Sequence, residues 1–152
     1  MAELVLRVDV DASVEDVWAG AVDWAGQGEW MLGTSVRPTA QGGQGVGGGI
    51  EAFTGVGRLG FLDTMEITRW DPPRACHVLH TGRVVRGTGA FEVEPRGGRL
   101  ATFVWSEDLE LPLGVVGRLG WPLVKPVFAA GVRVSLNRFA RWVEARAATR
   151  AA

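Results

Sequence analysis

The chain has 152 residues, about the length of one ordinary domain. Apolar residues make up 47% and charged residues 22%, a composition typical of a folded chain and not of a disordered one. Sixteen Lys and Arg against seventeen Asp and Glu give a net charge of -1, so no general positive field would attract a nucleic acid. We therefore predict a single domain over residues 1–152 with no nucleic-acid partner.

The distribution of charges and the single cysteine predict where the protein is located in the cell. The longest stretch without Asp, Glu, Lys or Arg, residues 38–50, is mostly glycine, whereas a membrane-spanning helix needs about 20 mainly apolar residues. Glu3, Arg7 and Asp9 interrupt the N-terminus where a secretory signal would have an unbroken apolar segment. The single cysteine, Cys76, cannot form an internal disulfide or a thiolate metal cage. We expect a cytoplasmic protein without integral membrane association.

The N-terminal region predicts a strand followed by two short helices. Apolar and polar residues alternate over residues 4–10, as in a half-buried strand. Ser13 followed by Asp16 resembles a helix N-cap with an acidic partner, and apolar residues then recur at helical spacing as far as Val22. Glycines interrupt this pattern, so we expect a second short helix or turn over residues 24–31.

The middle of the chain, from Thr34 to Leu111, predicts antiparallel strands. Its predominant period is two, and clusters of Gly and Pro divide it into about six segments. These expected strands cover residues 34–40, 49–56, 61–71, 74–81, 84–94 and 99–111. The turns between them are short, whereas a parallel return needs a crossover of about a dozen residues or more. The pattern therefore predicts an antiparallel meander.

After the last expected strand the period becomes that of a helix. The apolar face of this helix repeats through Val132, Leu136, Phe139 and Val143. We expect the helix to run from Pro122 or Leu123 to Ala148, with Pro122 and Pro126 in a first turn or at a kink. Seven Trp and 22 Gly favour a bent sheet around a hollow, because large rings line cavities and glycine lets strands bend.

Five segments have a family resemblance. They are VDVDASVEDVW at 8–18, WDPPR at 70–74, GTGAFEV at 87–93, residues 100–111 with the hairpin before them, and the final long helix. Together they resemble the START-like superfamily, also called SRPBCC, and within it the bacterial polyketide cyclase/dehydrase and lipid-transport type. The resemblance covers nearly the whole chain.

The resemblance implies an α+β domain with the helix-grip fold. In this fold a curved antiparallel sheet of seven strands wraps around the long C-terminal helix, and two short helices follow the first strand. A hydrophobic ligand would lie between sheet and helix, with polar residues at a few inward positions. Because the superfamily includes sterol and lipid carriers, cyclases, dehydratases, hydrolases and hormone receptors, the fold does not name one activity.

An acid and a histidine are expected to lie near one another on the inward face. Asp63 and Met65 share a face of the strand 61–71 with apolar neighbours. The tightest turn to the next strand would have Asp71 and Arg74 opposite one another. With that turn Met65 lies opposite His80, and Asp63 lies diagonal to His80. The two groups either form an acid–imidazole pair for proton transfer or are each hydrogen-bonded to backbone or water near a strand end.

Glu107 is a second inward acid. It falls on the apolar face of the last strand, with Phe103 and Trp105. One interpretation is a general acid or base acting on a carbonyl or hydroxyl substrate. The other is a structural partner of Arg86 or His80, because an isolated ionised acid facing a cavity needs a donor.

Two further motifs do not support a cofactor. Cys76, His77 and His80 fit C-H-x-x-H, but residues 77 and 80 point to opposite faces of a strand, so we expect no metal. The glycines at 43–48 fit G-x-G-x-x-G, but a strand follows them where the dinucleotide fingerprint needs a helix. We expect this run to be a hairpin tip near the cavity mouth, and we predict no bound cofactor.

The sequence therefore predicts a domain that binds a small hydrophobic molecule, such as a lipid, polyketide or aromatic metabolite. The catalytic candidates are Asp63, His80 and Glu107. The expected ligand-binding residues are Trp30, Met31, Met65, Val78, Arg86, Phe91, Phe103, Trp105, Trp121, Phe128 and Val132. The alternatives are a polyketide cyclase, aromatase or dehydratase that uses the inward groups for proton transfer, and a module that binds another protein. The sequence also allows a homodimer.

Overall fold

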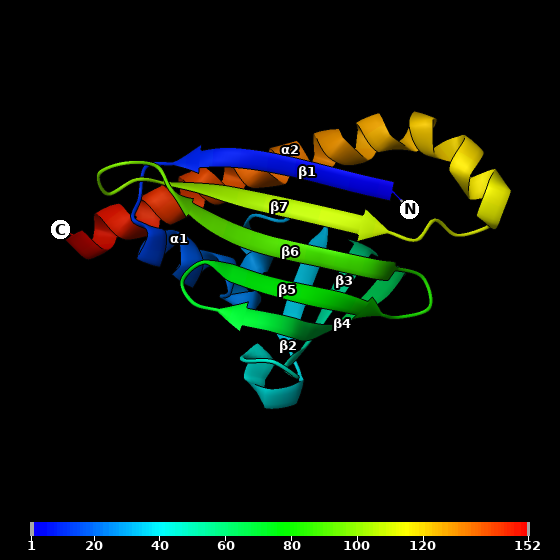
Figure 1. Cartoon of the computed structure of the whole chain (residues 1–152), viewed down its shortest axis with the longest axis horizontal. Helices are drawn as coiled ribbons and strands as arrows, with labels where there is room; N and C mark the ends of the chain where they lie inside the picture. Colours follow the sequence, from blue (N-terminus) through cyan, green and yellow to red (C-terminus); the bar gives the residue numbers. More distant parts are fainter. Residues whose placement is uncertain (1, 152) are drawn as a thin grey trace.

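The computed structural model describes residues 2–151, and it begins with a strand and two short helices (Figure 1). Strand β1 (Ala2–Val10) leads into helix α1 (Val14–Ala21) and the short 3-10 helix η1 (Trp24–Glu29). The Oγ atom of Ser13 accepts a hydrogen bond from the backbone N–H of Asp16 at 3.1 Å, which confirms the predicted N-cap.

The remaining strands form one antiparallel meander. They are β2 (Thr34–Pro38), β3 (Gly49–Val56), β4 (Leu59–Asp71), β5 (Ala75–Thr81), β6 (Arg86–Pro95) and β7 (Ala101–Leu109), with the 3-10 helix η2 (Ala40–Gly43) between β2 and β3. The strand order in the sheet is β1-β7-β6-β5-β4-β3-β2, so β1 joins at the edge of β7. The predicted strands are all present, although several end up to two residues from the predicted limits.

The register between β4 and β5 depends on a β-bulge. Met65 lies opposite His80, as predicted, but the turn differs because Asp71 pairs with Ala75. A bulge between Ile67 and Arg69 compensates for this one-residue shift. A shift of one residue would move every side chain of a strand to the other face of the sheet. The bulge is therefore what places His80 on the inward face beside Met65.

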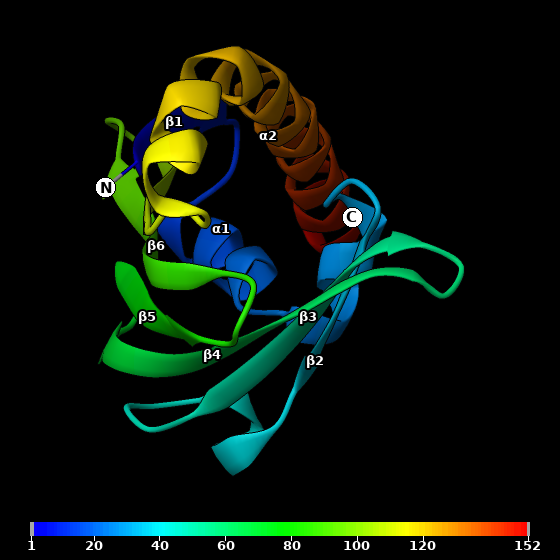
Figure 2. The same ribbon diagram turned by 90° about the vertical axis from the view of Figure 1, so that its right-hand side faces the viewer.

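Helix α2 (Gly114–Ala151) closes the open side of the curved sheet, which completes the predicted helix-grip fold (Figure 2). The predicted start at Pro122 or Leu123 is wrong, because the helix begins at Gly114 and includes both prolines. A proline inside a helix removes one hydrogen bond and crowds the preceding turn, so it kinks a helix without necessarily ending it. The first half of α2 accordingly bends away from the line of the second half (Figure 1).

Aromatic rings fill one part of the space between sheet and helix. Trp30, Phe103 and Phe139 are fully buried. The ring centroids of Phe103 and Phe139 are 4.4 Å apart, and those of Trp30 and Phe139 are 4.8 Å apart. These contacts attach the second half of α2 to the sheet.

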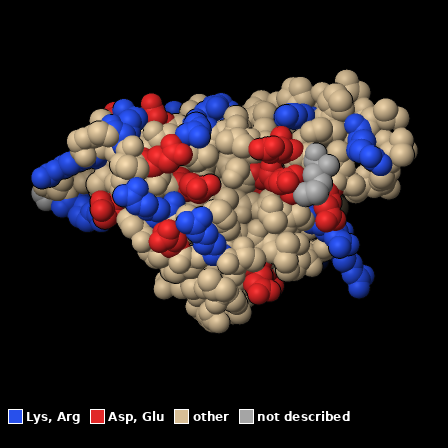
Figure 3. Space-filling model, in the orientation of Figure 1, with Lys and Arg blue, Asp and Glu red and all other residues tan. Residues whose placement is uncertain are grey.

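The first half of α2 leaves large apolar side chains exposed. They are Val115, Val116, Leu119, Leu123, Val124 and Val127. The surface at this end of the molecule is mainly tan in Figure 3, whereas both signs of charge mix over the sheet. No helix within residues 2–151 has the length and hydropathy needed to cross a membrane.

Candidate ligand-binding site

A cavity of about 400 Å³ lies between the sheet and the middle of α2. This volume falls within the range of about 300–1,000 Å³ that is typical of small-molecule sites. Seven of the predicted ligand-binding residues line it: Met31, Met65, Val78, Phe91, Trp105, Phe128 and Val132. The three catalytic candidates line it as well, so the cavity combines apolar walls with one polar cluster.

Four predicted ligand-binding residues lie elsewhere. Trp30 and Phe103 belong to the filled aromatic core. Trp121 lies on the first half of α2, outside the cavity wall, with its ring centroid 6.3 Å from that of Phe128. Arg86 points to the outer surface, where its Nε atom lies 3.4 Å from Oε2 of Glu110. None of these four side chains is placed to touch a molecule in the cavity.

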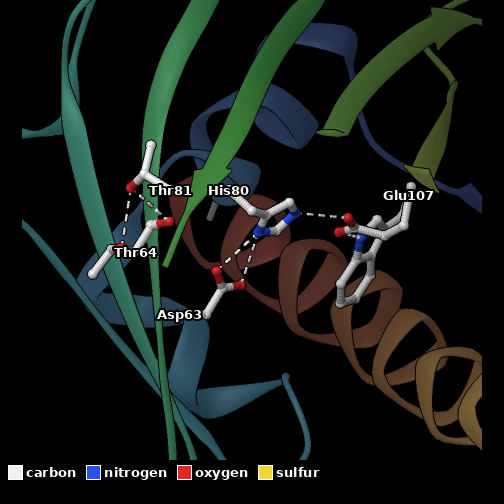
Figure 4. A network of polar contacts seen from close by, with 6 residues as sticks. Asp63, Thr64, His80, Thr81 and Glu107 are labelled. Atoms are coloured by element: carbon white, nitrogen blue, oxygen red, sulfur yellow. Dashed lines mark hydrogen bonds and ion pairs between the residues drawn. The ribbon is translucent and has the colours of Figure 1, made fainter. Parts of the chain in front are cut away.

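The three inward polar groups form one continuous network (Figure 4). The Nδ1 atom of His80 lies 2.9 Å and 3.0 Å from the two carboxylate oxygens of Asp63. Its Nε2 atom lies 2.9 Å from Oε2 of Glu107. His80 therefore joins the two acids. The sequence allowed either Arg86 or His80 as the partner of Glu107, and the structure has His80.

The two acids reach His80 from opposite sides of strand β5. Asp63 comes from the neighbouring strand β4, while Glu107 lies on β7 and must cross β6 to reach β5. Gly89, which pairs with Glu107, leaves that path open, because a Cβ atom there would lie 2.7 Å from Oε2 of Glu107. The contact between Glu107 and His80 therefore depends on a glycine in β6, the strand that lies between them.

The network carries an ionised histidine. Burial lowers the pKa of His80, but the hydrogen bonds to Asp63 and Glu107 and the charges of these carboxylates raise it by more, to about 9. The imidazole is therefore protonated at neutral pH and donates through both ring nitrogens. Its side chain is only 4% exposed, whereas those of Asp63 and Glu107 are 14% and 13% exposed. The cluster presents its carboxylate oxygens to the cavity.

Trp105 fixes the position of Glu107. Its indole Nε1–H donates a hydrogen bond of 2.8 Å to Oε1 of Glu107, whose other oxygen faces His80. The ring of Trp105 also forms part of the apolar wall. This arrangement can orient the polar end of a bound molecule, and it can move protons between a ligand and a carboxylate–imidazole pair.

Several lining residues were missed by the sequence argument. The helix contributes Val127, Gly131 and Ser135, and the sheet contributes Ile50, Ala52, Thr54 and Ala90 among others. Gly131 and Ser135 lie three and seven residues after Phe128, so their spacing places them on the helix face that was predicted to cover the cavity. Their small or polar side chains hid them from a search for apolar residues.

No group of His, Cys, Asp and Glu side chains in the described part of the chain is arranged to hold a metal ion. Cys76 lies in the cavity wall, and burial raises the pKa of its thiol to about 12. The thiol is therefore protonated and unreactive at neutral pH. The glycine run at 43–48 is not among the residues that line the cavity.

Comparisons with known proteins agree with this architecture. The protein TTHA0849 from Thermus thermophilus superposes with a TM-score of 0.77 at 19% identity, over 95% of this chain and 99% of that one. The Zhui aromatase/cyclase from Streptomyces sp. R1128 also superposes with a TM-score of 0.77, at 16% identity, over 95% of this chain and 94% of that one.

A more distant likeness is that to the Aha1 dimer from Colwellia psychrerythraea. It has a TM-score of 0.68 at 14% identity and covers 95% of this chain and 97% of that one. No curated protein sequence matches the chain. The family model for polyketide cyclase / dehydrase and lipid transport matches residues 1–144. The chain therefore belongs to the polyketide cyclase/dehydrase and lipid transport family.

Proposed function

We propose that this protein binds a small, mainly apolar molecule in the cavity between the sheet and α2. The observation that carries the proposal is a hollow of about 400 Å³ with apolar walls and a single polar cluster. Apolar walls supply affinity through the area they remove from water, while a few polar groups fix the orientation of the ligand. A protein-binding module is less well supported, because such a domain has no need of a polar cluster inside a cavity.

Gly131 offers a test that leaves the polar cluster intact. This residue lines the cavity in the middle of α2, and a Cβ atom placed on it would meet no other atom within 4 Å. Gly131→Leu should therefore fill part of the hollow. Gly120→Leu is the matched control, because Gly120 is also in α2 with free space around it but does not line the cavity.

The experiment is a fluorescence titration with Nile red, an uncharged apolar dye. Wild type and Gly120→Leu should show saturable binding of about one dye molecule per chain. Gly131→Leu should lose at least about tenfold in affinity, because the added side chain occupies the site. Equal dye affinity in the two leucine variants, or no saturable binding by wild type, would contradict the proposal.

A second candidate function is ring closure of a poly-ketone chain followed by loss of water. The observation that favours it is the acid–imidazole–acid network in the cavity wall, in a fold shared with the Zhui aromatase/cyclase. A folded chain would bring an enol carbon against one of its own carbonyl carbons, and such positioning supplies much of the rate. A carboxylate that faces the cavity would accept the enol proton, and the network, with His80 as its relay, would return a proton to the carbonyl oxygen as the new bond forms. A carboxylate would then remove a proton from the neighbouring carbon, and the network would return it to the new hydroxyl, which leaves as water.

This candidate is separable from simple binding. A synthetic poly-β-ketone chain should cyclise faster with wild type than in buffer, with the product detected by mass spectrometry. His80→Asn should abolish the acceleration and retain Nile red binding. Wild-type rates equal to those in buffer would leave the protein as a carrier, and acceleration by His80→Asn equal to that of wild type would remove His80 from the reaction.

A further inference from the structure

The hydrogen atoms of the polar cluster are already engaged within the protein. Both ring nitrogens of His80 face carboxylate oxygens at 2.9–3.0 Å, and the indole N–H of Trp105 is bonded to Glu107. A ligand that approaches the cluster therefore meets no free N–H group on these residues. What remains is the unused hydrogen-bonding capacity of the carboxylate oxygens of Asp63 and Glu107, and a carboxylate can only accept.

The other polar side chains of the wall are engaged in a similar way. Thr34 Oγ1 donates to the backbone oxygen of Leu32, so Thr54 is the donor in the 3.0 Å contact between the two hydroxyls. The indole N–H of Trp24 donates to the backbone oxygen of Gly43 at 2.7 Å. The Nε2 atom of Gln27 donates to the backbone oxygen of Ala21 at 2.9 Å. Ser135 accepts a hydrogen bond of 3.0 Å from the backbone N–H of Leu32, and it is only 3% exposed, so its hydroxyl offers little surface to a ligand.

The charge of the cavity wall also disfavours an anionic ligand. Its ionisable network consists of two carboxylates and one imidazolium, so it carries a net charge of -1 when all three groups are ionised. No Lys or Arg is among the described residues that line the cavity. An anionic head group would therefore be desolvated beside a net negative cluster without a cation to pair with it.

We propose that the cavity selects ligands whose polar end donates a hydrogen bond, as a hydroxyl or amine does, and rejects ligands that end in a carboxylate or phosphate. This inference rests on the proposed ligand binding and specifies the chemistry of the ligand. A hydrogen bond from a neutral donor to an ionised acceptor is among the stronger ones in proteins. The preference should therefore be measurable with small aromatic probes that share one skeleton.

Three naphthalene derivatives that differ only in their polar group would test this preference. Isothermal titration calorimetry at pH 7 would compare 2-naphthol, which has a donor, with 2-methoxynaphthalene, which has none, and with 2-naphthoate, which is an anion. We expect 2-naphthol to bind at least about tenfold more tightly than the methyl ether, the ratio that one hydrogen bond to a charged group would produce. We expect 2-naphthoate to bind most weakly of the three.

A Glu107→Gln variant should weaken the preference for a hydrogen-bond donor and the rejection of an anion. Its side-chain oxygen can accept from the Nε2–H group of His80, and its amide group then offers N–H to the cavity where the carboxylate offered only an acceptor. The advantage of 2-naphthol should fall, and the affinity for 2-naphthoate should rise at least about tenfold. Glu110→Gln is the matched control, because Glu110 lies on the outer surface, and it should leave all three affinities unchanged.

The outcomes separate this inference from the proposed function. Binding of the ether or of 2-naphthoate as tight as that of 2-naphthol would overturn the donor preference and leave ligand binding in place. The same conclusion would follow if Nile red bound and none of the three probes did. Failure of Nile red and all three probes would overturn the proposed function itself.

Discussion

The two ends of the space between the sheet and α2 differ in what occupies them. At one end Trp30, Phe103 and Phe139 fill the space completely, and their rings contact one another within 4.4–6.4 Å between centroids. Around the middle of α2 the same sheet and the same helix leave a cavity of about 400 Å³. Residues that stabilise the fold and residues that face the cavity are therefore separated along one helix.

This separation has a physical reason. A filled core gains stability from the apolar area it buries and from close packing, whereas an unfilled cavity forgoes both. The domain can leave part of its interior unfilled because the ring cluster attaches the second half of α2 to the sheet. Substitutions at the filled end should therefore change stability strongly, while substitutions around the hollow should change charge and binding with less effect on folding.

The largest effect is expected at Phe139. This side chain is fully buried, and it packs against Trp30 and Phe103. Phe139→Ala should lower the free energy of unfolding by about 3–5 kcal/mol, because it removes a buried ring and leaves a void. Urea denaturation would measure the loss, and a change below about 1 kcal/mol would show that the filled end does not hold the helix.

The ionised histidine should make stability depend on pH. Its pKa is raised from 6.5 to about 9 on folding, so the folded state binds its proton more tightly than the unfolded state. The stability from this proton is fully present below pH 6.5 and is lost as the pH rises through about 9. The free energy of unfolding should fall across this window by up to about 1.4 kcal/mol per pH unit.

Urea denaturation at several pH values from 6 to 9.5 would measure this slope. His80→Asn is the control, because it removes the titrating group, and its stability should vary less over the same range. A wild-type free energy of unfolding that is constant or rises across the window would contradict an imidazolium held between two carboxylates.

A smaller effect is expected from a substitution at Gly89, which should move Glu107 away from His80. A methyl group at Gly89 would lie 2.7 Å from the carboxylate of Glu107, whose flexible end must then move away. Gly89→Ala should therefore weaken the contact between Glu107 and His80 and lower the pKa of His80 by at least about one unit, the usual effect of one nearby opposite charge. NMR titration of the imidazole would show this shift, and an unchanged pKa would mean that Gly89 is not required for the network.

The smallest effect is expected in the first half of α2. Leu119 is 74% exposed, so it buries little area on folding. Leu119→Ser should change the free energy of unfolding by less than about 0.5 kcal/mol, as is usual for surface positions. A loss comparable to that of Phe139→Ala would show that this half of the helix packs against the domain in solution.

The inward face of the sheet was predictable because strand alternation is a local property. Alternation alone placed Asp63 and Glu107 on the apolar faces of their strands, and the structure agrees. The register that brings Met65 opposite His80 was predicted from the wrong turn. The shift at the turn and the bulge after Ile67 compensate for one another, and neither has a clear signal in the sequence.

The contacts between distant elements were not predictable. Glu107 reaches His80 because the sheet curves and because Gly89 leaves the way open, and both depend on the tertiary arrangement. The start of α2 was misplaced because Pro122 and Pro126 were expected to lie in a first turn or at a kink, and the helix was therefore taken to begin beside them. Which end of the interior would be filled and which left hollow also depends on side-chain packing across elements, and strand and helix periods do not reveal it.

The central claim is that the space beside Gly131 is empty, and the free energy of unfolding of Gly131→Leu tests it most directly. If the space is empty, the leucine enters it without strain, and the variant should be as stable as wild type or up to about 1 kcal/mol more stable, the gain in helix propensity over glycine. Gly120→Leu should show the same gain from propensity alone. A loss of about 1–3 kcal/mol in Gly131→Leu, as overpacking a filled core produces, would contradict the account.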